Sequence, residues 1–345
     1  MRNAFWSKLY IALALLLLLS PLLGMWLMQP AGAGANQILA SPPQLRQRDG
    51  SWNLQVLNDS ADYLADHFGL RQELVGLWSG LNAKLLASSA EDQVILGKDG
   101  WLYYAPTLPD YTGQSLSDAQ LEAIALRLGQ IQAEVESRGA VFLFTVAPNK
   151  NSLHPEAMPN AYPRRHEESS IVRLQPYLER CGVHYVDLFS LPMPYCRTDT
   201  HWTAEGAAMA ADRLLSALDR QSSYAAGPFR DGQADAPGDL YEMLFPAGSF
   251  REDTRLYAGA IRFEHLNRPN GGNAITIRTA GEGEGSLFCW RDSFGIALYP
   301  YLADAFESAC FSRSTEYSLP EGSYDAVILE LVERNLPQLL PDPAA

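Results

Sequence analysis

Leu287-Phe288-Cys289-Trp290-Arg291-Asp292-Ser293-Phe294-Gly295 joins a short apolar run to a serine and a glycine. A run of apolar residues between polar neighbours is typical of a buried strand. A serine directly after such a strand lies at a strand-to-helix turn. There its hydroxyl is exposed, and its backbone N–H can point toward an oxyanion. We therefore predict that Ser293 is a nucleophile.

A second motif, Asp199-Thr200-His201-Trp202-Thr203, supplies the partners that an activated serine needs. An aspartate two residues before a histidine can orient the imidazole ring, and the ring can accept the serine proton. The two motifs together predict a catalytic triad of Ser293, His201 and Asp199. In the competing interpretation, Asp199 and Thr200 only cap the helix after Thr203, and His201 is an ordinary loop histidine.

The pattern of apolar runs and helical periodicity predicts an α/β fold between the two motifs and around them. Strands are predicted over 141–146, 184–188, 286–290, 309–312 and 326–331, and helices over 117–139, 166–180, 203–218 and 295–307. Strands that alternate with helices form a parallel sheet covered on both faces, and ligands bind beyond the carboxyl ends of such strands. Both motifs follow strands, so we expect them to meet at that edge of a three-layer domain.

The N-terminus predicts export from the cytoplasm. The run 9–28 is almost entirely apolar and, at about 20 residues, is long enough to span a bilayer as a helix. We expect a cytoplasmic tip and transmembrane anchor over 1–28, a tether over 29–50 and one domain over 51–345 with an insertion at about 221–285. The alternative is a cleaved signal peptide, with processing sites at Ala31-Gly32-Ala33 or Ala33-Gly34-Ala35.

Composition limits the function classes. A net charge of −14 with no basic stripe excludes a nucleic-acid-binding protein. The histidines lack the spacing of a zinc site, so we expect neither a metal nor a cofactor. Export would place the cysteines in an oxidising compartment, which favours disulfides. Cys181–Cys196 is the preferred pair, because it brackets the approach to Asp199; Cys289 and Cys310 form either a second disulfide or two buried thiols.

The two motifs occur in an order that resembles the AlgX/AlgJ-type alginate O-acetyltransferases, which are SGNH-hydrolase-like enzymes of bacterial exopolysaccharide export. The similarity extends over about residues 90–336. Further matching segments are Gly97-Lys98-Asp99-Gly100-Trp101-Leu102-Tyr103, the stretch 148–159, Gly238-Asp239-Leu240 and Glu330-Leu331-Val332-Glu333-Arg334.

This resemblance implies a circularly permuted SGNH fold, since the Asp-His motif precedes the serine strand. It implies O-acetylation of an exported polysaccharide in the periplasm, with an anchor in the inner membrane and a membrane-bound acyltransferase as the acetyl-donating partner. The second oxyanion donor is open among Asn335, Arg334 and Arg313. Trp202 is either a packing residue beside the site or a platform on which a sugar stacks.

Two other functions remain compatible with these residues. With water as the acyl acceptor, the same triad would make an esterase or a polysaccharide deacetylase. A non-catalytic, polysaccharide-binding scaffold of an export complex is the third possibility, although an intact Ser-His-Asp set argues against it. The residues favour no particular polymer, acetyl donor or oligomeric state.

Overall fold

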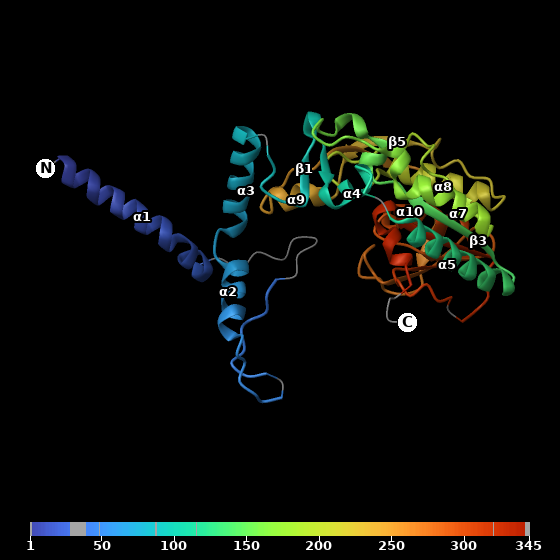
Figure 1. The fold of residues 1–345 in the computed structure, drawn as a ribbon, viewed down its shortest axis with the longest axis horizontal. Helices are drawn as coiled ribbons and strands as arrows, with labels where there is room; N and C mark the ends of the chain where they lie inside the picture. The colour runs from blue at the N-terminus through green and yellow to red at the C-terminus, as the bar shows by residue number, and fades with distance from the viewer. Residues whose placement is uncertain are drawn as a thin grey trace. The chain divides into compact units, whose positions relative to one another are not determined.

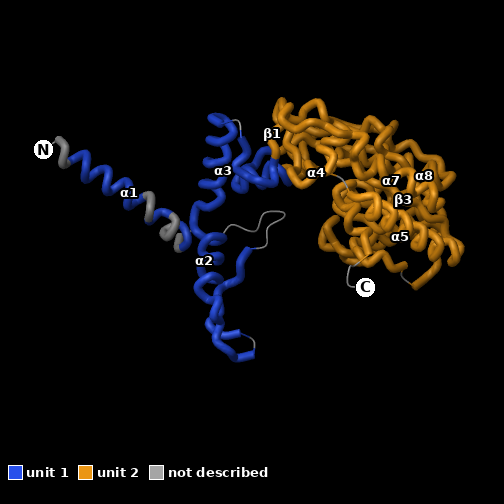
Figure 2. Tube along the Cα trace, in the orientation of Figure 1, with its two compact units in different colours: residues 1–94, 239–250 blue, residues 95–238, 251–345 orange. Residues whose placement is uncertain are grey.

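A computed structural model describes residues 2–27, 39–47, 49–86, 88–114, 116–319 and 321–341. The chain divides into two compact units (Figure 2). Unit 1 comprises Met1–Val94 and Asp239–Phe250, and unit 2 comprises Ile95–Gly238 and Arg251–Ala345. The division differs from the expected single domain over 51–345, because residues 51–94 cluster with part of the insertion.

Unit 1 is helical. Its elements are α1 (Arg2–Leu27), α2 (Val56–His67), α3 (Arg71–Leu81), a π-helix (Asn82–Leu86) and α9 (Asp239–Leu244). Phe245, just after α9, packs against α3, where a Cβ placed on Gly76 would lie 3.8 Å from the Phe245 ring. This aromatic contact explains why the helices before residue 94 associate with 239–250.

The predicted transmembrane anchor over 1–28 is not supported. Residues Arg2–Leu27 do form a single helix. However, none of the helices in the described ranges is sufficiently long and apolar for a membrane span. Both predicted cleavage sites, and the tether up to residue 38, lie outside the residues that the structure describes.

Unit 2 is built on a seven-stranded sheet in the order β4-β3-β11-β9-β10-β8-β7. The strands, in that order, are Tyr185–Val186, Val141–Ala147, Ala326–Val332, Ser286–Trp290, Ser308–Ser312, Thr276–Gly281 and Phe263–His265. The first five are parallel, as the sequence predicts. The last two come from the predicted insertion and extend one edge in antiparallel fashion.

Helices cover both faces of this sheet, so the predicted three-layer α/β architecture is confirmed (Figure 1). One face packs against α5 (Asp118–Ser137) and α7 (Ser170–Cys181), and the other against α8 (Ala204–Ala217) and α10 (Gly295–Ala305). Ser117 and Gln120 form a capping box at the start of α5. Thr203 caps α8 through the backbone N–H of Gly206.

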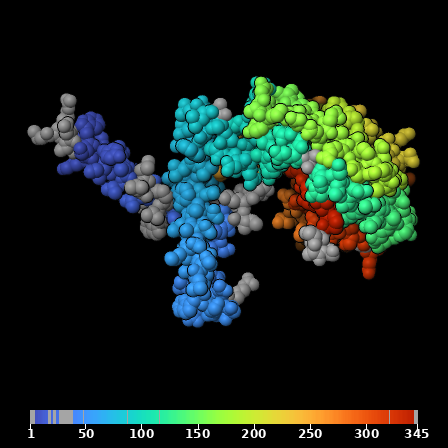
Figure 3. Space-filling view, viewed as in Figure 1, coloured from blue at the N-terminus to red at the C-terminus, as the bar shows by residue number. Residues whose placement is uncertain are grey.

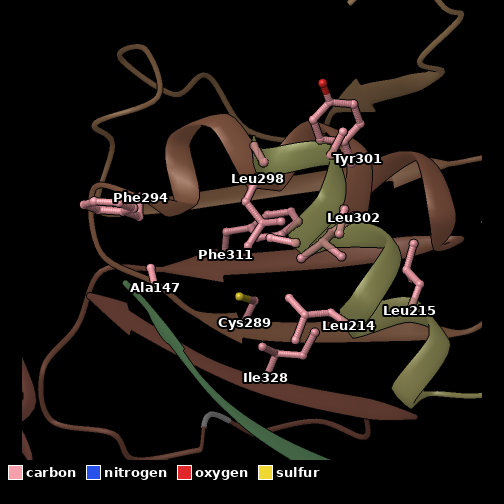
Figure 4. Packing of buried hydrophobic residues seen from close by; sticks show 14 of the residues in the cluster. Ala147, Leu214, Leu215, Cys289, Phe294, Leu298, Tyr301, Leu302, Phe311 and Ile328 are labelled. Atoms are coloured by element: carbon pink, nitrogen blue, oxygen red, sulfur yellow. The ribbon is translucent and has the colours of Figure 1, made fainter. Parts of the chain in front are cut away.

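The α8–α10 side of the sheet holds a packed apolar layer (Figure 4). Cys289 and Ile328 from neighbouring strands contact this layer, and Phe294 lies at the start of α10. On the opposite face, the 3-10 segment Glu333–Leu339 lies beside α5 at the surface (Figure 3). Arg127 of α5 donates to the carbonyls of Leu339 and Leu340 there.

Two hairpins accompany the sheet. Residues 94–104 form a hairpin of β1 (Val94–Leu96) and β2 (Leu102–Tyr104), and the insertion forms β5 (Phe229–Gln233) paired with β6 (Asp253–Tyr257). The remaining short helices are Lys98–Gly100, Ala105–Thr107, α4 (Leu108–Tyr111), α6 (Lys150–Leu153), Pro155–Ala157 and His166–Glu168.

No disulfide joins the four cysteines, all of which the structure describes, so neither Cys181–Cys196 nor a Cys289–Cys310 disulfide is supported. Cys289 and Cys310 are free thiols, one buried and one partly buried, which is the alternative given for them. Cys181 ends α7 and packs on the α5 side of the sheet, whereas Cys196 lies in the loop before Trp202. Cys310 pairs in register with Phe288, and Cys289 pairs with Phe311. This offset of one residue sends the two thiols to opposite faces of the sheet.

Candidate active site

Ser293 lies in the turn between β9 and α10, where the sequence predicts a nucleophile. Its carbonyl accepts a hydrogen bond from the backbone N–H of Ile296 (3.1 Å), which closes the first turn of the helix. Gly295 is required at this point, because a Cβ there would lie 2.6 Å from the Cβ of Arg291. The tight turn leaves the Ser293 side chain only partly buried, at the carboxyl end of the sheet.

The structure brings Ser293, His201 and Asp199 together. The Ser293 hydroxyl lies 2.9 Å from His201 Nε2. On the other side of the ring, His201 Nδ1 lies 2.6 Å from Asp199 Oδ1, which also accepts the His201 backbone N–H at 2.9 Å. With the proton on Nδ1, Nε2 is able to accept the serine proton. The distances are those of a nucleophile, its base and the group that orients the base.

Aromatic side chains support the base from one side. The ring centroids of Phe294 and His201 are 4.8 Å apart. Trp202 donates its indole N–H to the Phe294 carbonyl (3.2 Å) and packs edge-on against the Phe294 ring. Trp202 is only 3% exposed. Its placement supports the packing interpretation of Trp202 and argues against a platform for a sugar.

The Asp292 carboxylate links the turn that contains Ser293 to the end of β11 through hydrogen bonds. Its Oδ1 accepts the backbone N–H of Phe294 (2.9 Å), and its Oδ2 accepts the backbone N–H of Val332 (2.7 Å). The amide of Asn335 donates to the same Oδ2 at 2.8 Å. One carboxylate therefore ties together the turn of Ser293 and the segment that carries Asn335.

Residues 94–263 match the family described as "SGNH hydrolase-like domain, acetyltransferase AlgX". A probable alginate O-acetylase AlgJ of Pseudomonas aeruginosa is 31% identical over 155 residues, covering 43% of this chain and 38% of that protein. Another, of Pseudomonas syringae pv. tomato, is 26% identical over 171 residues, covering 47% and 42%. Over residues 94–263, just under half of its length, the chain resembles the AlgX/AlgJ-type proteins. It aligns with less than half the length of these relatives.

A solved structure, that of Bacillus cereus PatB1, is similar to this chain with a TM-score of 0.53. The sequences are 13% identical, and the likeness covers 70% of this chain and 96% of that one. At this identity the similarity concerns the fold alone. It agrees with the SGNH-like α/β architecture of unit 2.

The three candidates for a second oxyanion donor occupy different places in this site. Asn335 lines a cavity of about 140 Å³ together with Ser293, Arg313 and Gln338. Arg313 also lines this cavity and donates to the side chain and carbonyl of Asn273. The Arg334 guanidinium instead lies over the rings of Tyr104 and Phe294. Of the three, Asn335 is the one that binds Asp292 of the nucleophile turn.

The buried acid Glu330 is one residue of this site that sequence reasoning missed. It accepts the Asp292 backbone N–H through Oε2 (3.3 Å), while Oε1 has no hydrogen-bond partner among the described residues. Burial, followed by the charge of Asp292, raises the pKa of Glu330 well above its ordinary value, which favours the neutral acid. A lone acidic residue inside the apolar run 326–331 was the available signal. Glu252, in the insertion, was also missed: it accepts hydrogen bonds from the loop that carries Asp199, and the sequence around it gives no comparable signal.

Proposed function

We propose that this chain is an O-acetyltransferase that moves an acetyl group onto a hydroxyl of an exopolysaccharide through an acetyl-serine intermediate. The observation that carries the proposal is the aligned chain of contacts from Ser293 Oγ through His201 to Asp199. The family match and the name alginate O-acetylase of its relatives support the reaction class and an alginate-like acceptor.

In the first half-reaction Ser293 Oγ attacks the carbonyl carbon of the acetyl donor, and His201 Nε2 accepts the hydroxyl proton. Asp199 stabilises the imidazolium that forms. The tetrahedral intermediate collapses when the bond to the leaving group breaks, and His201 returns the proton to that group. The product is acetyl-Ser293 with a neutral His201.

In the second half-reaction a sugar hydroxyl replaces the leaving group. His201 Nε2 accepts its proton while the sugar oxygen attacks the acetyl carbon. Collapse of this intermediate breaks the bond to Ser293 Oγ, which regains the proton. An acceptor held in the site gains an effective concentration that bulk water lacks, so transfer outpaces hydrolysis.

Asn335 is the second oxyanion donor in this proposal, beside the backbone N–H of Ser293. One amide hydrogen is directed to Asp292, and the other is available to the cavity that Ser293 also lines. We expect Asn335→Ala to lower kcat by about 10²- to 10³-fold with little change in KM, as for other oxyanion donors. Steady-state kinetics with an acetyl ester measure this. A fall confined to KM would assign Asn335 to binding instead.

We further propose that the protein acts in the periplasm and receives acetyl groups through a membrane-bound acyltransferase in the inner membrane. The basic tip and the apolar sequence 9–28 support export. Acetyl-CoA is confined to the cytoplasm, so the donor must reach the site through a partner. The order of the motifs, with Asp199 and His201 before Ser293, supports a circularly permuted SGNH chain. Cell fractionation of the tagged full-length protein tests its location.

Product analysis tests the transferase proposal. The full-length chain is incubated with a small acetyl ester and candidate oligosaccharides, and the products are identified by mass spectrometry. We expect acetylated oligosaccharide when an acceptor is present and slow release of free acetate when it is absent. Efficient acetate release with every acceptor, together with removal of acetyl groups from an acetylated polymer, would instead establish a deacetylase.

A further inference from the structure

We propose that Lys150 and Glu252 are positioning residues that hold the loop of Asp199 and His201 from two sides. Lys150 binds the carbonyl oxygens of the loop, and Glu252 binds its backbone amides. The loop then presents His201 to Ser293 in the geometry of the triad. The inference rests on the proposed Ser-His-Asp function and assigns a role in it to the insertion, which supplies Glu252.

Lys150 and Glu252 together form a clamp on the loop of Asp199 and His201. The lysine side of this clamp is buried. Lys150 is 5% exposed, at the start of α6 after β3. Its Nζ donates to the carbonyls of Cys196 (2.9 Å), Arg197 (3.1 Å) and Asp199 (2.5 Å). An ammonium group removed from water requires such partners, since an unpaired buried charge costs several kcal/mol. Nζ also lies 5.7 Å and 5.4 Å from the ring centroids of Trp101 and Tyr103.

The glutamate side comes from the insertion, immediately before β6. Glu252 Oε1 accepts the backbone N–H of Arg197 (2.7 Å). Oε2 accepts both the backbone N–H and the hydroxyl of Thr198, each at 2.9 Å. Hydrogen bonds from amides to an ionised carboxylate are among the stronger ones in proteins. The insertion is also in close steric contact with the loop, because a Cβ on Gly238 would lie 2.3 Å from the Thr198 carbonyl oxygen.

The clamp acts on a loop whose ends are already closed. Tyr195 and Trp202 form an isolated antiparallel bridge, and the N–H of Cys196 donates to the carbonyl of His201. The contacts between its two ends fix the shape of the loop. The contacts of Lys150 and Glu252 fix its orientation toward Ser293. A displacement of about 1 Å between reacting groups can cost about 10²-fold in rate. The clamp therefore sets the rate of the chemical step rather than the binding of substrate.

Steady-state kinetics with a chromogenic acetyl ester test this role in the full-length protein. We expect Lys150→Met and Glu252→Gln each to lower kcat about 100-fold while KM stays near that of the wild type. Lys150→Arg, which can still donate to carbonyls, should recover part of the rate. Matched controls are Lys98→Met, an exposed lysine, and Asp231→Asn, a fully exposed carboxylate on the same hairpin; both should keep wild-type kinetics.

A double-variant comparison separates positioning from a general structural effect. If Lys150 acts through His201, then adding Lys150→Met to His201→Ala causes no further fall in the residual rate. A further fall, or single variants with kcat within about two-fold of wild type, would overturn the inference. If Lys150→Met does not fold, the same comparison is made with Glu252→Gln, alone and combined with His201→Ala. An active Ser293→Ala variant would instead overturn the proposed function itself.

Discussion

Replacing Ser293 by alanine is expected to lower kcat for acetyl transfer by about 10⁶-fold. The reason is the loss of the one protein atom that the proposed mechanism acetylates. His201→Ala should cost a similar factor, since a nucleophile and its base act as a unit and the double variant should be little worse than either single one. Transfer to an oligosaccharide, measured by mass spectrometry with purified full-length protein, gives the rates.

The fold should be unaffected by Ser293→Ala, because the hydroxyl supports no element of the described sheet. Circular dichroism and the thermal midpoint should match those of wild type. Ser137→Ala, at the exposed end of α5, is a control in which the same atom is removed far from the site. Acetylation at a near-normal rate by Ser293→Ala protein would refute the assignment of the nucleophile.

Asp199→Asn should lower kcat by about 10⁴-fold. In the wild type, Asp199 Oδ1 is 2.6 Å from His201 Nδ1 and keeps the proton on that nitrogen. An amide can present an N–H to Nδ1, which favours the other tautomer, with the proton on Nε2. That imidazole cannot accept the proton of Ser293. The pH dependence of kcat, measured beside the wild type, should show the loss at every pH at which the protein is folded.

Asp199→Glu is an informative companion. It keeps the charge but moves the carboxylate by one methylene, away from the backbone N–H of His201 that Asp199 also binds. A rate between those of wild type and Asp199→Asn is expected. Wild-type kinetics of Asp199→Asn would show that Asp199 only shapes the loop around His201, since α8 is capped by Thr203 and not by Asp199.

The strands of the sheet could be predicted because each is encoded locally. The run Val141–Ala147 is apolar almost without interruption, as a strand buried on both faces must be. The meeting of Ser293 with His201 followed from the same information, since the carboxyl ends of parallel strands share an edge. The starts of helices are also encoded locally. At the start of α5, the side chains of Ser117 and Gln120 each accept a hydrogen bond from the backbone N–H of the other residue.

The failed predictions depended on register and on distant contacts. Cys289 and Cys310 do lie on neighbouring strands, yet a shift of one residue places their side chains on opposite faces. No local pattern reveals such a shift. Phe245 packs on α3 from far along the chain, and Glu252 reaches the Asp199 loop from more than fifty positions away. Both contacts become visible only when the chain is folded.

The site consists of two parts that different residues hold in place. The serine turn and the proposed oxyanion donor form one piece, held by a single carboxylate. The histidine loop is a second piece, held by Glu252 of the insertion. Exchanging the part of the insertion that carries Glu252 is therefore expected to change the speed of proton transfer in both half-reactions, while the turn of Ser293 and its oxyanion donor stay in place.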